Sequence, residues 1–149
     1  MPVELCRATL ADLAPIVALQ HAAYAPNRAV LGVEPLPLLA DYTAILATME
    51  VWLSRSADRL DGVLILQPRD DDLLIWSVAT MPGHQQRGLG RALLEWSFRR
   101  AAELGRETLR LYTGTLLTDR VAWYRRHGFE VERVEEMPDR SVTHMVKRM

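Results

Sequence analysis

Two periods run through the apolar positions of the chain, and they predict its strands and helices. Alternating apolar and polar residues, or a short apolar run between turn residues, are typical of strands, whereas apolar positions three and four residues apart are typical of helices. The strand pattern occurs at residues 3–9, 50–55, 61–68, 72–80, 107–113, 129–137 and 140–149. The helix pattern occurs at residues 9–24 and 38–49, from the glycines near position 90 to Gly105, and at 118–128.

The order of these elements, βααβββαβαββ, predicts an α/β (α+β) fold. We expect one domain over residues 1–149, with a mixed, mostly antiparallel central sheet of about six to seven strands flanked by about four helices. Short turn segments between residues 50 and 80 favour an antiparallel meander there. Residues 26–37 contain three prolines and one glycine, so we expect this segment to be irregular.

Composition narrows the function classes without choosing one. The chain has 149 residues, of which 18 are basic and 19 acidic, so its net charge of −1 gives no general attraction to nucleic acid or to an anionic membrane. No apolar run approaches the ~20 residues that span a bilayer. The first ten residues lack a signal-peptide pattern and Cys6 has no second cysteine to pair with, so we expect a cytoplasmic protein. The four histidines lack metal-ligand spacing, and no metal is expected.

The most informative stretch is ATMPGHQQRGLGRALLEW, residues 79–96. A predicted strand ends within it, and an amphipathic helix begins directly after Gly88 and Gly90. At a helix N-terminus the first backbone N–H groups lack partners and the helix dipole is positive, which together favour a bound phosphate. Glycines let an anion approach the backbone, and Arg87 and Arg91 add positive charge. The stretch predicts an anion site, with a plain glycine turn as the alternative.

Two common phosphate-binding motifs do not fit this stretch. No Gly-Lys-Ser/Thr follows the glycines, which excludes a P-loop. Gly-Leu-Gly is followed by Arg-Ala-Leu, so the third glycine of the dinucleotide fingerprint is missing.

Together with a second motif, the glycine turn resembles a known family. Gln85-x-x-Gly88-x-Gly90 resembles the acetyl-CoA-binding signature of the GCN5-related N-acetyltransferases, the GNAT family. WYRRHGFEVE, residues 123–132, resembles the family's second landmark, an aromatic–Tyr helix that ends in Gly-Phe. Residues 23–42 are similar to a helix-loop-helix of one bacterial branch, so the resemblance extends over nearly the whole chain.

The resemblance implies a site for acetyl-CoA. In the family the pantetheine arm lies like an added strand beside the strand before the glycine turn, which here corresponds to backbone groups of Val78, Ala79 and Thr80. A backbone N–H of that strand often stabilises the oxyanion of the tetrahedral intermediate that forms when an amine attacks the thioester. The pyrophosphate lies on the turn, which here corresponds to Gln86, Arg87, Gly88, Leu89, Gly90 and Arg91.

The resemblance also implies a proton donor for the leaving thiolate, at Tyr124. A tyrosine with an ordinary pKa of about 10 is protonated at neutral pH and can donate. Two departures from the family concern the same region. The Asn that many members carry near the start of the last helix is absent, since the candidate positions hold Leu117 and Arg120. The Glu that some members use as a base corresponds to Tyr112, so the base is unassigned; a water relay ending on Tyr112, on Ser77 or on a loop residue is the preferred hypothesis.

Two functions are left open by the sequence. One is an N-acetyltransferase that moves acetyl from acetyl-CoA to a primary amine of a small molecule, peptide or protein, and the other is a non-catalytic module that binds or senses acyl-CoA. The acceptor is expected to lie against residues 26–45, near Tyr24, Tyr42 and Trp76, and its identity is not indicated. A homodimer is also left open.

Overall fold

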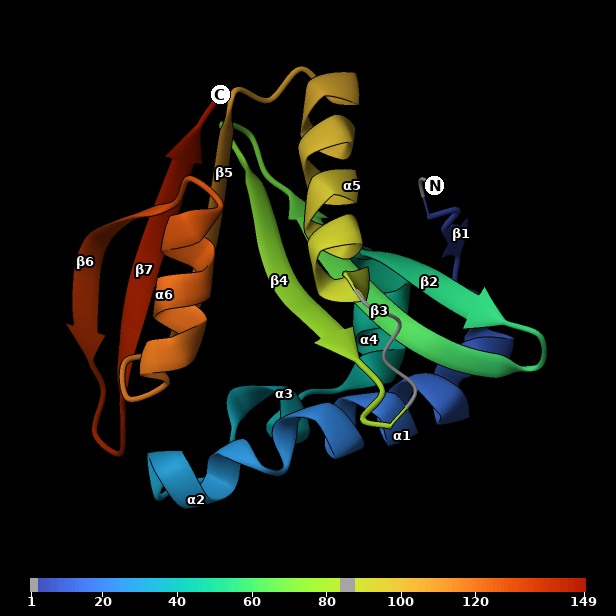
Figure 1. The fold of residues 1–149 in the computed structure, drawn as a ribbon, viewed down its shortest axis with the longest axis horizontal. Helices are drawn as coiled ribbons and strands as arrows, with labels where there is room; N and C mark the ends of the chain where they lie inside the picture. Colours follow the sequence, from blue (N-terminus) through green and yellow to red (C-terminus); the bar gives the residue numbers. More distant parts are fainter. Residues whose placement is uncertain (1–2, 84–87) are drawn as a thin grey trace.

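The computed structural model describes residues 3–83 and 88–149, which form one open sheet with helices on both faces (Figure 1). The strands are β1 (Cys6–Arg7), β2 (Glu50–Ser56), β3 (Arg59–Pro68), β4 (Leu73–Thr80), β5 (Thr108–Gly114), β6 (Glu130–Glu136) and β7 (Ser141–Arg148). The helices are the short 3₁₀ turn η1 (Leu10–Asp12), α1 (Leu13–Tyr24), α2 (Asn27–Leu31), α3 (Leu36–Leu39), α4 (Tyr42–Thr48), α5 (Leu89–Glu103) and α6 (Thr118–Arg126). In this described part, no helix has the length and apolar character that crossing a bilayer requires.

The sheet has the order β1-β2-β3-β4-β5-β7-β6, and every neighbouring pair is antiparallel except β4 and β5, which are parallel. The expected α/β class and mixed, mostly antiparallel sheet are confirmed, and so is the meander of β2, β3 and β4. The first strand is shorter than the predicted 3–9, because only Cys6 and Arg7 pair with β2.

The prediction of an irregular segment over residues 26–37 is wrong, because α2 and the first half of α3 lie there and raise the number of α-helices above the expected four. The residues that suggested irregularity act as helix boundaries instead. Pro26 stands directly before α2, and Gly32, with φ of 74°, ends it. Proline suits a first helical turn and glycine suits the left-handed cap, so both residues are compatible with short helices.

The predicted helix over 38–49 is in fact two helices, α3 and α4, and α4 begins only at Tyr42. Asp41 caps it, since one carboxylate oxygen accepts hydrogen bonds from the backbone N–H groups of Thr43 and Ala44 at 3.0 and 3.2 Å. A capping aspartate has extended backbone geometry, which interrupts the helical pattern at this residue.

Both faces of the sheet are buried. Val63 and Ile65 of β3 pack with α1 and α4 on one face, and Leu64 and Leu66 pack with α5 and the α6 side of the core on the other. Side chains alternate between the two faces of a strand, so a strand that is covered on both sides is apolar throughout. This explains why β3 is buried along almost its whole length.

The central pair, β4 and β5, separates along its length. Only Leu73 and Leu74 of β4 form ladder pairs with β5, and Figure 1 shows the two strands diverging from that end. A bulge accompanies the divergence, because Ile65 pairs with Ser77 while Leu66 pairs with Ile75, which leaves Trp76 as an extra residue on β4. Bulges bend a strand and increase its twist. The bend opens a wedge between the two strands at the middle of the sheet.

Candidate active site

The glycine turn ends at the N-terminus of α5, as the sequence predicts. Gly88 occupies the N-cap position with φ of 82°, and no side chain caps the helix there. Its carbonyl accepts the first helical hydrogen bond, from the N–H of Ala92, at 2.9 Å. Glycine adopts this left-handed geometry without a steric penalty. A Cβ at Gly88 would meet no atom within 4 Å, and one at Gly90 would meet only the Trp123 ring at 3.7 Å. Within the described residues, Gly88 therefore faces open space, and Gly90 has room for a Cβ in ordinary contact with Trp123.

A groove runs from this turn along β4. It is lined by backbone or side-chain atoms of Ala23, Tyr24, Asn27, Val78, Ala79, Thr80, Pro82, Gly88, Leu89, Gly90, Arg91, Arg120 and Trp123. The structure thus brings together all of the expected cofactor-binding residues except Gln86 and Arg87, which lie outside the described residues. Leu89 is only 2% exposed and Ala79 only 5%, so they offer mainly backbone to this groove.

The edge of β4 that faces the wedge presents backbone donors. In an antiparallel ladder successive residues face the partner strand and turn away from it in alternation. The N–H of Met81 donates to the carbonyl of Asp61 in β3 at 2.8 Å, so Ala79 also faces β3 while Val78 and Thr80 turn toward the wedge. Past Leu74 no ladder pair joins β4 to β5 in the described chain, which leaves this edge accessible to a ligand.

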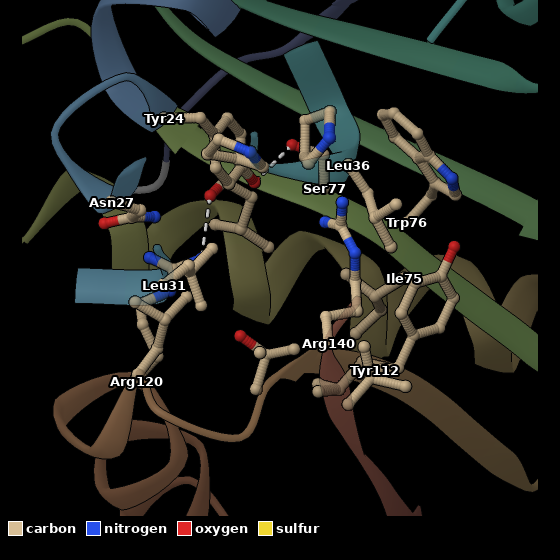
Figure 2. A pocket seen from close by; sticks show the side chains of 18 of the residues that line it. Tyr24, Asn27, Leu31, Leu36, Ile75, Trp76, Ser77, Tyr112, Arg120 and Arg140 are labelled. Atoms are coloured by element: carbon tan, nitrogen blue, oxygen red, sulfur yellow. Dashed lines mark hydrogen bonds between the residues drawn. The ribbon is translucent and has the colours of Figure 1, made fainter. Parts of the chain in front are cut away.

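A second pocket lies on the other side of the wedge. Its volume is about 730 Å³ when the open solvent at its mouth is included. Figure 2 shows Ile75, Trp76 and Ser77 of β4 on one wall, with Tyr112, Arg140 and Leu31 around them. The segment expected to bind the acceptor contributes Asn27, Leu31, Val33, Pro35, Leu36 and Pro37. Tyr42, which was expected near the acceptor, does not line the pocket but is buried beneath it.

The two hollows meet at one place. Tyr24, Asn27, Val78 and Arg120 line both of them. A ligand that extends along the groove therefore reaches the same residues as a ligand that fills the pocket. Two ligands bound in the groove and in the pocket would therefore be adjacent at these shared residues.

Arg120 stands at this junction, and Tyr124, which lines the pocket, lies one helical turn further along α6. Nη2 of Arg120 donates to the Tyr124 hydroxyl at 3.2 Å and to the backbone carbonyl of Val78 at 3.2 Å. Tyr124 is 4% exposed. Burial raises the pKa of the Tyr124 phenol above its ordinary value, although the Arg120 charge acts in the opposite direction. The phenol is therefore protonated at neutral pH. Because Arg120 is the donor in the hydrogen bond between the two residues, the O–H of Tyr124 remains available to donate.

The candidate proton acceptors are hydroxyl groups. Ser77 Oγ lies 2.7 Å from the Tyr24 hydroxyl and accepts a hydrogen bond from Gln20 Nε2 at 3.1 Å. Tyr112 lines the pocket as well, and burial raises the pKa of its phenol. Burial also raises the pKa of Tyr42, to about 12, although a hydrogen bond from Gln20 opposes the shift. Among the described residues that line either hollow there is no Asp or Glu, which agrees with the absence of a carboxylate base in the sequence pattern.

Sequence reasoning missed two polar residues at the junction. Arg120 was noted only as one of two residues at the candidate positions of an absent Asn, with no role of its own, and Asn27 was not singled out. The spacing of Arg120 and Tyr124, four residues apart on a predicted helix, is a usable signal, because such residues share one face. No local signal marks Asn27, since its place depends on how α2 packs over the wedge.

A groove for a cofactor at a wedge between two central strands is typical of one class of enzymes, the acetyltransferases. The comparisons with known proteins identify the family. The family model described as the acetyltransferase (GNAT) domain matches residues 47–131. The chain belongs to the GNAT family of acetyltransferases, and the expected class of enzyme, an acetyl-CoA-dependent N-acetyltransferase, is confirmed at that level. The sequence finds no match among curated proteins.

Solved structures with similar folds cover the whole chain. A GNAT acetyltransferase from Elizabethkingia anophelis with acetyl-CoA bound is 17% identical with a TM-score of 0.77, and 99% of each chain is covered. PaiA N-acetyltransferase from Thermoplasma acidophilum in complex with coenzyme A is 15% identical with a TM-score of 0.80, and both chains are covered completely. The ribosomal-protein-S18-alanine N-acetyltransferase from Escherichia coli is 18% identical with a TM-score of 0.77, with 97% and 92% covered. At these identities the likeness concerns the fold.

Proposed function

We propose that the protein transfers the acetyl group of acetyl-CoA to a primary amine that binds in the pocket beside Trp76 and Tyr112. The observation that supports this most is the junction of the groove and the pocket at Val78 and Arg120, where Arg120 also donates a hydrogen bond to the Tyr124 hydroxyl in the pocket. A direct transfer needs both substrates in contact at one point, with a proton donor there. We further propose that residues 1–149 act as one domain and, from the composition, that the protein is cytoplasmic.

Acetyl-CoA is proposed to bind along the groove. The N-terminal N–H groups of α5, at Gly88, Leu89 and Gly90, together with Gln86, Arg87 and Arg91, hold the pyrophosphate. Of the expected residues Val78, Ala79 and Thr80, the backbone groups of Val78 and Thr80 align the pantetheine arm, because the unpaired edge of β4 can accept an added strand, while Ala79 pairs with β3 and holds that edge in place. A backbone N–H on the same edge stabilises the oxyanion.

The reaction begins when the nitrogen lone pair of the amine attacks the thioester carbonyl. A C–N bond forms, and the tetrahedral intermediate carries a negative charge on oxygen and a positive charge on nitrogen. The nitrogen loses one proton to water, and collapse of the intermediate breaks the C–S bond and leaves the neutral amide. The thiolate takes the proton of the Tyr124 hydroxyl. The hydrogen bond from Arg120 to the same oxygen stabilises the phenolate that this transfer leaves, and solvent returns the proton.

The second candidate function is a non-catalytic acyl-CoA-binding module. The lack of a carboxylate along the described lining of both hollows favours it, because many transfers to amines need a base. Tyr124 beside the junction opposes it, since a binding module needs no proton donor there.

A thiol-release assay distinguishes the two functions. The protein is incubated with acetyl-CoA and a panel of amines with neutral, acidic and peptide character, and free CoA is measured with a thiol reagent. Release that depends on both the amine and the protein supports transfer. Tight binding of acetyl-CoA in a calorimetric titration, with no amine-dependent release for any member of the panel, would establish the binding module instead.

A further inference from the structure

The pocket that the proposed function assigns to the acceptor has an unusual charge balance. Its described lining contains Arg120 and Arg140 but no Asp or Glu. Most of the remaining lining is apolar, with Leu31, Val33, Leu36, Ile75, Trp76, Leu111 and Val142 among it. A cationic ligand would meet positive charge here without compensation.

The charge of Arg140 is already balanced. Its Nε and Nη2 donate to the two carboxylate oxygens of Asp139 at 3.2 and 3.0 Å, and its Nη1 donates to the carbonyl of Glu34 at 2.8 Å. All three nitrogens have partners, and the side chain is only 9% exposed. Arg140 therefore shapes the pocket and offers little to a ligand.

Arg120 differs in this respect. Both of its hydrogen bonds, to Val78 and to Tyr124, come from Nη2. A guanidinium has N–H donors on all three nitrogens. No ion pair joins Arg120 to a carboxylate within residues 3–83 and 88–149, so Nε and Nη1 of a partly buried cation remain for a ligand.

Asn27 adds a neutral donor beside this cation. It is the first residue of α2 and lines both hollows, as Arg120 does. Figure 2 shows Asn27 and Arg120 on the same side of the pocket. For the part of the chain that the structure describes, the hydrogen bonds include none from the Asn27 side chain. An amide and a guanidinium that line the same part of a pocket can both donate to one carboxylate.

The acceptor must also supply a neutral amine to the thioester. A pocket with an unpaired cation and no carboxylate disfavours a lone ammonium ion. An amine that has its own carboxylate avoids this penalty, because the carboxylate pairs with Arg120 while the amine lies beside Val78 and Tyr124. The apolar walls then accommodate an uncharged side chain.

We infer that the acceptor is an amino acid with an apolar or aromatic side chain, and that Arg120 and Asn27 bind its carboxylate. This inference rests on the proposed function and specifies its substrate class. The products are the N-acetyl amino acid and free CoA. Polyamines and other polycationic amines are excluded as good acceptors by the same charge argument.

The first test compares three amines of similar shape, L-phenylalanine, L-phenylalaninamide and phenylethylamine. Initial rates of CoA release are measured at equal concentrations of unprotonated amine. We expect kcat/KM for phenylalanine to exceed that for each of the other two by about 10- to 100-fold, the range for a charge-assisted hydrogen bond. Equal rates, or a preference for phenylethylamine, would overturn the inference and leave the proposed function intact.

The second test uses variants and the ratio of the phenylalanine rate to the phenylethylamine rate. In Arg120→Gln both rates fall, because Arg120 contacts Tyr124, and we expect the ratio to collapse to about one. The matched control is Arg126→Gln, which removes the same charge from an exposed position of the same helix and keeps the ratio. Asn27→Asp introduces a carboxylate at the first position of α2, where an acidic residue is compatible with the helix dipole, and we expect it to invert the preference. A ratio unchanged in both pocket variants would contradict the assignment of these residues.

A binding experiment keeps the inference testable if no amine is acetylated. Phenylpropanoate, which has the carboxylate and ring but no amine, is titrated calorimetrically into the wild type and the two arginine variants. We expect Arg120→Gln to bind it about tenfold or more weakly and Arg126→Gln to bind it as the wild type does. That result without any CoA release would support the carboxylate site and refute the transfer function. Absence of phenylpropanoate binding, or equal affinity in all three proteins, would refute the site.

Discussion

Tyr124 combines two properties at the residue scale that suit a proton donor. It lines the pocket beside the junction, where its oxygen accepts a hydrogen bond from Arg120 at 3.2 Å, and burial raises the pKa of its phenol. Burial keeps the proton on the phenol until the thiolate forms, and Arg120 stabilises the negative charge afterwards. A buried tyrosine without a cation beside it would keep its proton too firmly to donate it.

We predict that Tyr124→Phe lowers turnover by about 10²–10⁴-fold, the usual range for a general acid, with little change in acetyl-CoA affinity. The ring and its packing against Phe129 and Trp123 remain, so only the hydroxyl is lost. The measurements are turnover with one identified amine and cofactor affinity by calorimetry. Tyr42→Phe serves as the control, because it removes a buried hydroxyl that lines neither hollow. Equal turnover in Tyr124→Phe and the wild type, with chemistry limiting the rate, would show that the proton comes from solvent.

Gly90 allows the phosphate site to be tested without strain in the fold. Its Cβ would make only an ordinary contact with Trp123, and it lies in the first turn of α5, where an acidic side chain is favourable. We predict that Gly90→Asp keeps or slightly raises the melting temperature but reduces acetyl-CoA affinity by about 100-fold or more, because like charges meet in the groove. Gly90→Ala, which adds the methyl group alone, is the matched control. Wild-type affinity in Gly90→Asp would refute the phosphate site.

The pairing of β4 with β5 is limited at the element scale to one end, and Asp72 secures that end. Asp72 precedes β4, its side chain is 5% exposed, and it accepts hydrogen bonds from Arg69 at 2.6 and 2.7 Å and from Arg110 of β5 at 2.9 Å. Arg110 continues the network to Glu132 of β6 at 2.8 Å. The ion pairs thus join the strands where the wedge closes, while the bulge at Trp76 opens its other end.

We predict that Asp72→Asn lowers the free energy of unfolding by about 1–3 kcal/mol at pH 7, because it removes the carboxylate that pairs with Arg69 and one of the two that pair with Arg110. Hydrogen bonds from Arg69 contribute most to holding the pKa of Asp72 below its ordinary value. A lowered folded-state pKa stabilises the fold above the unfolded pKa of about 3.9, and this contribution disappears as the pH falls through the folded value. The difference in the free energy of unfolding between Asp72→Asn and the wild type should therefore become smaller as the pH falls below about 4. Urea titrations at several pH values measure it, with exposed Asp71→Asn as the control; a constant difference would contradict the ion-pair account.

The strands and long helices could be predicted because each has an apolar period of its own. α2 and α3 could not, since helices of five and four residues are too short to show a period and contain the Pro and Gly that usually indicate loops. The pairing order at the end of the sheet, β5-β7-β6, depends on contacts between distant strands and leaves no local pattern. The bulge at Trp76 has the same origin.

The candidate site shows the same division. The glycine turn, the strand edge before it and Tyr124 follow local motifs, so the sequence could indicate them. Arg120 and Asn27 derive their importance from lining the same two hollows, although they lie far apart in the sequence, and only the assembled fold reveals that. The absence of a carboxylate along the described lining is likewise a property of the assembled pocket.

The assembled molecule makes one prediction about pH. Both hollows lack a carboxylate in their described lining, and burial keeps the pKa values of Tyr112 and Tyr124 above their ordinary values, so no group there is expected to act as a base near neutral pH. The acceptor must then lose its proton to water before it attacks. We predict that log(kcat/KM) rises with a slope of about one and levels off at the pKa of the acceptor amine itself, about 7.7–8.0 for a peptide α-amine and about 10.4 for a lysine-like amine.

The same raised pKa values determine the alkaline side of the profile. Because the pKa of the Tyr124 phenol is raised, this phenol keeps its proton up to at least its ordinary pKa of about 10. We therefore expect no decrease in kcat/KM at any pH below about 10. The measurement is kcat/KM from pH 6 to 10 for two or more accepted amines of different pKa. If the rising limb moves with the amine, solvent removes the proton; a limb fixed at one pH for every amine would identify a base on the protein, with the Tyr24–Ser77 pair, 2.7 Å apart beside the junction, as the first position to mutate.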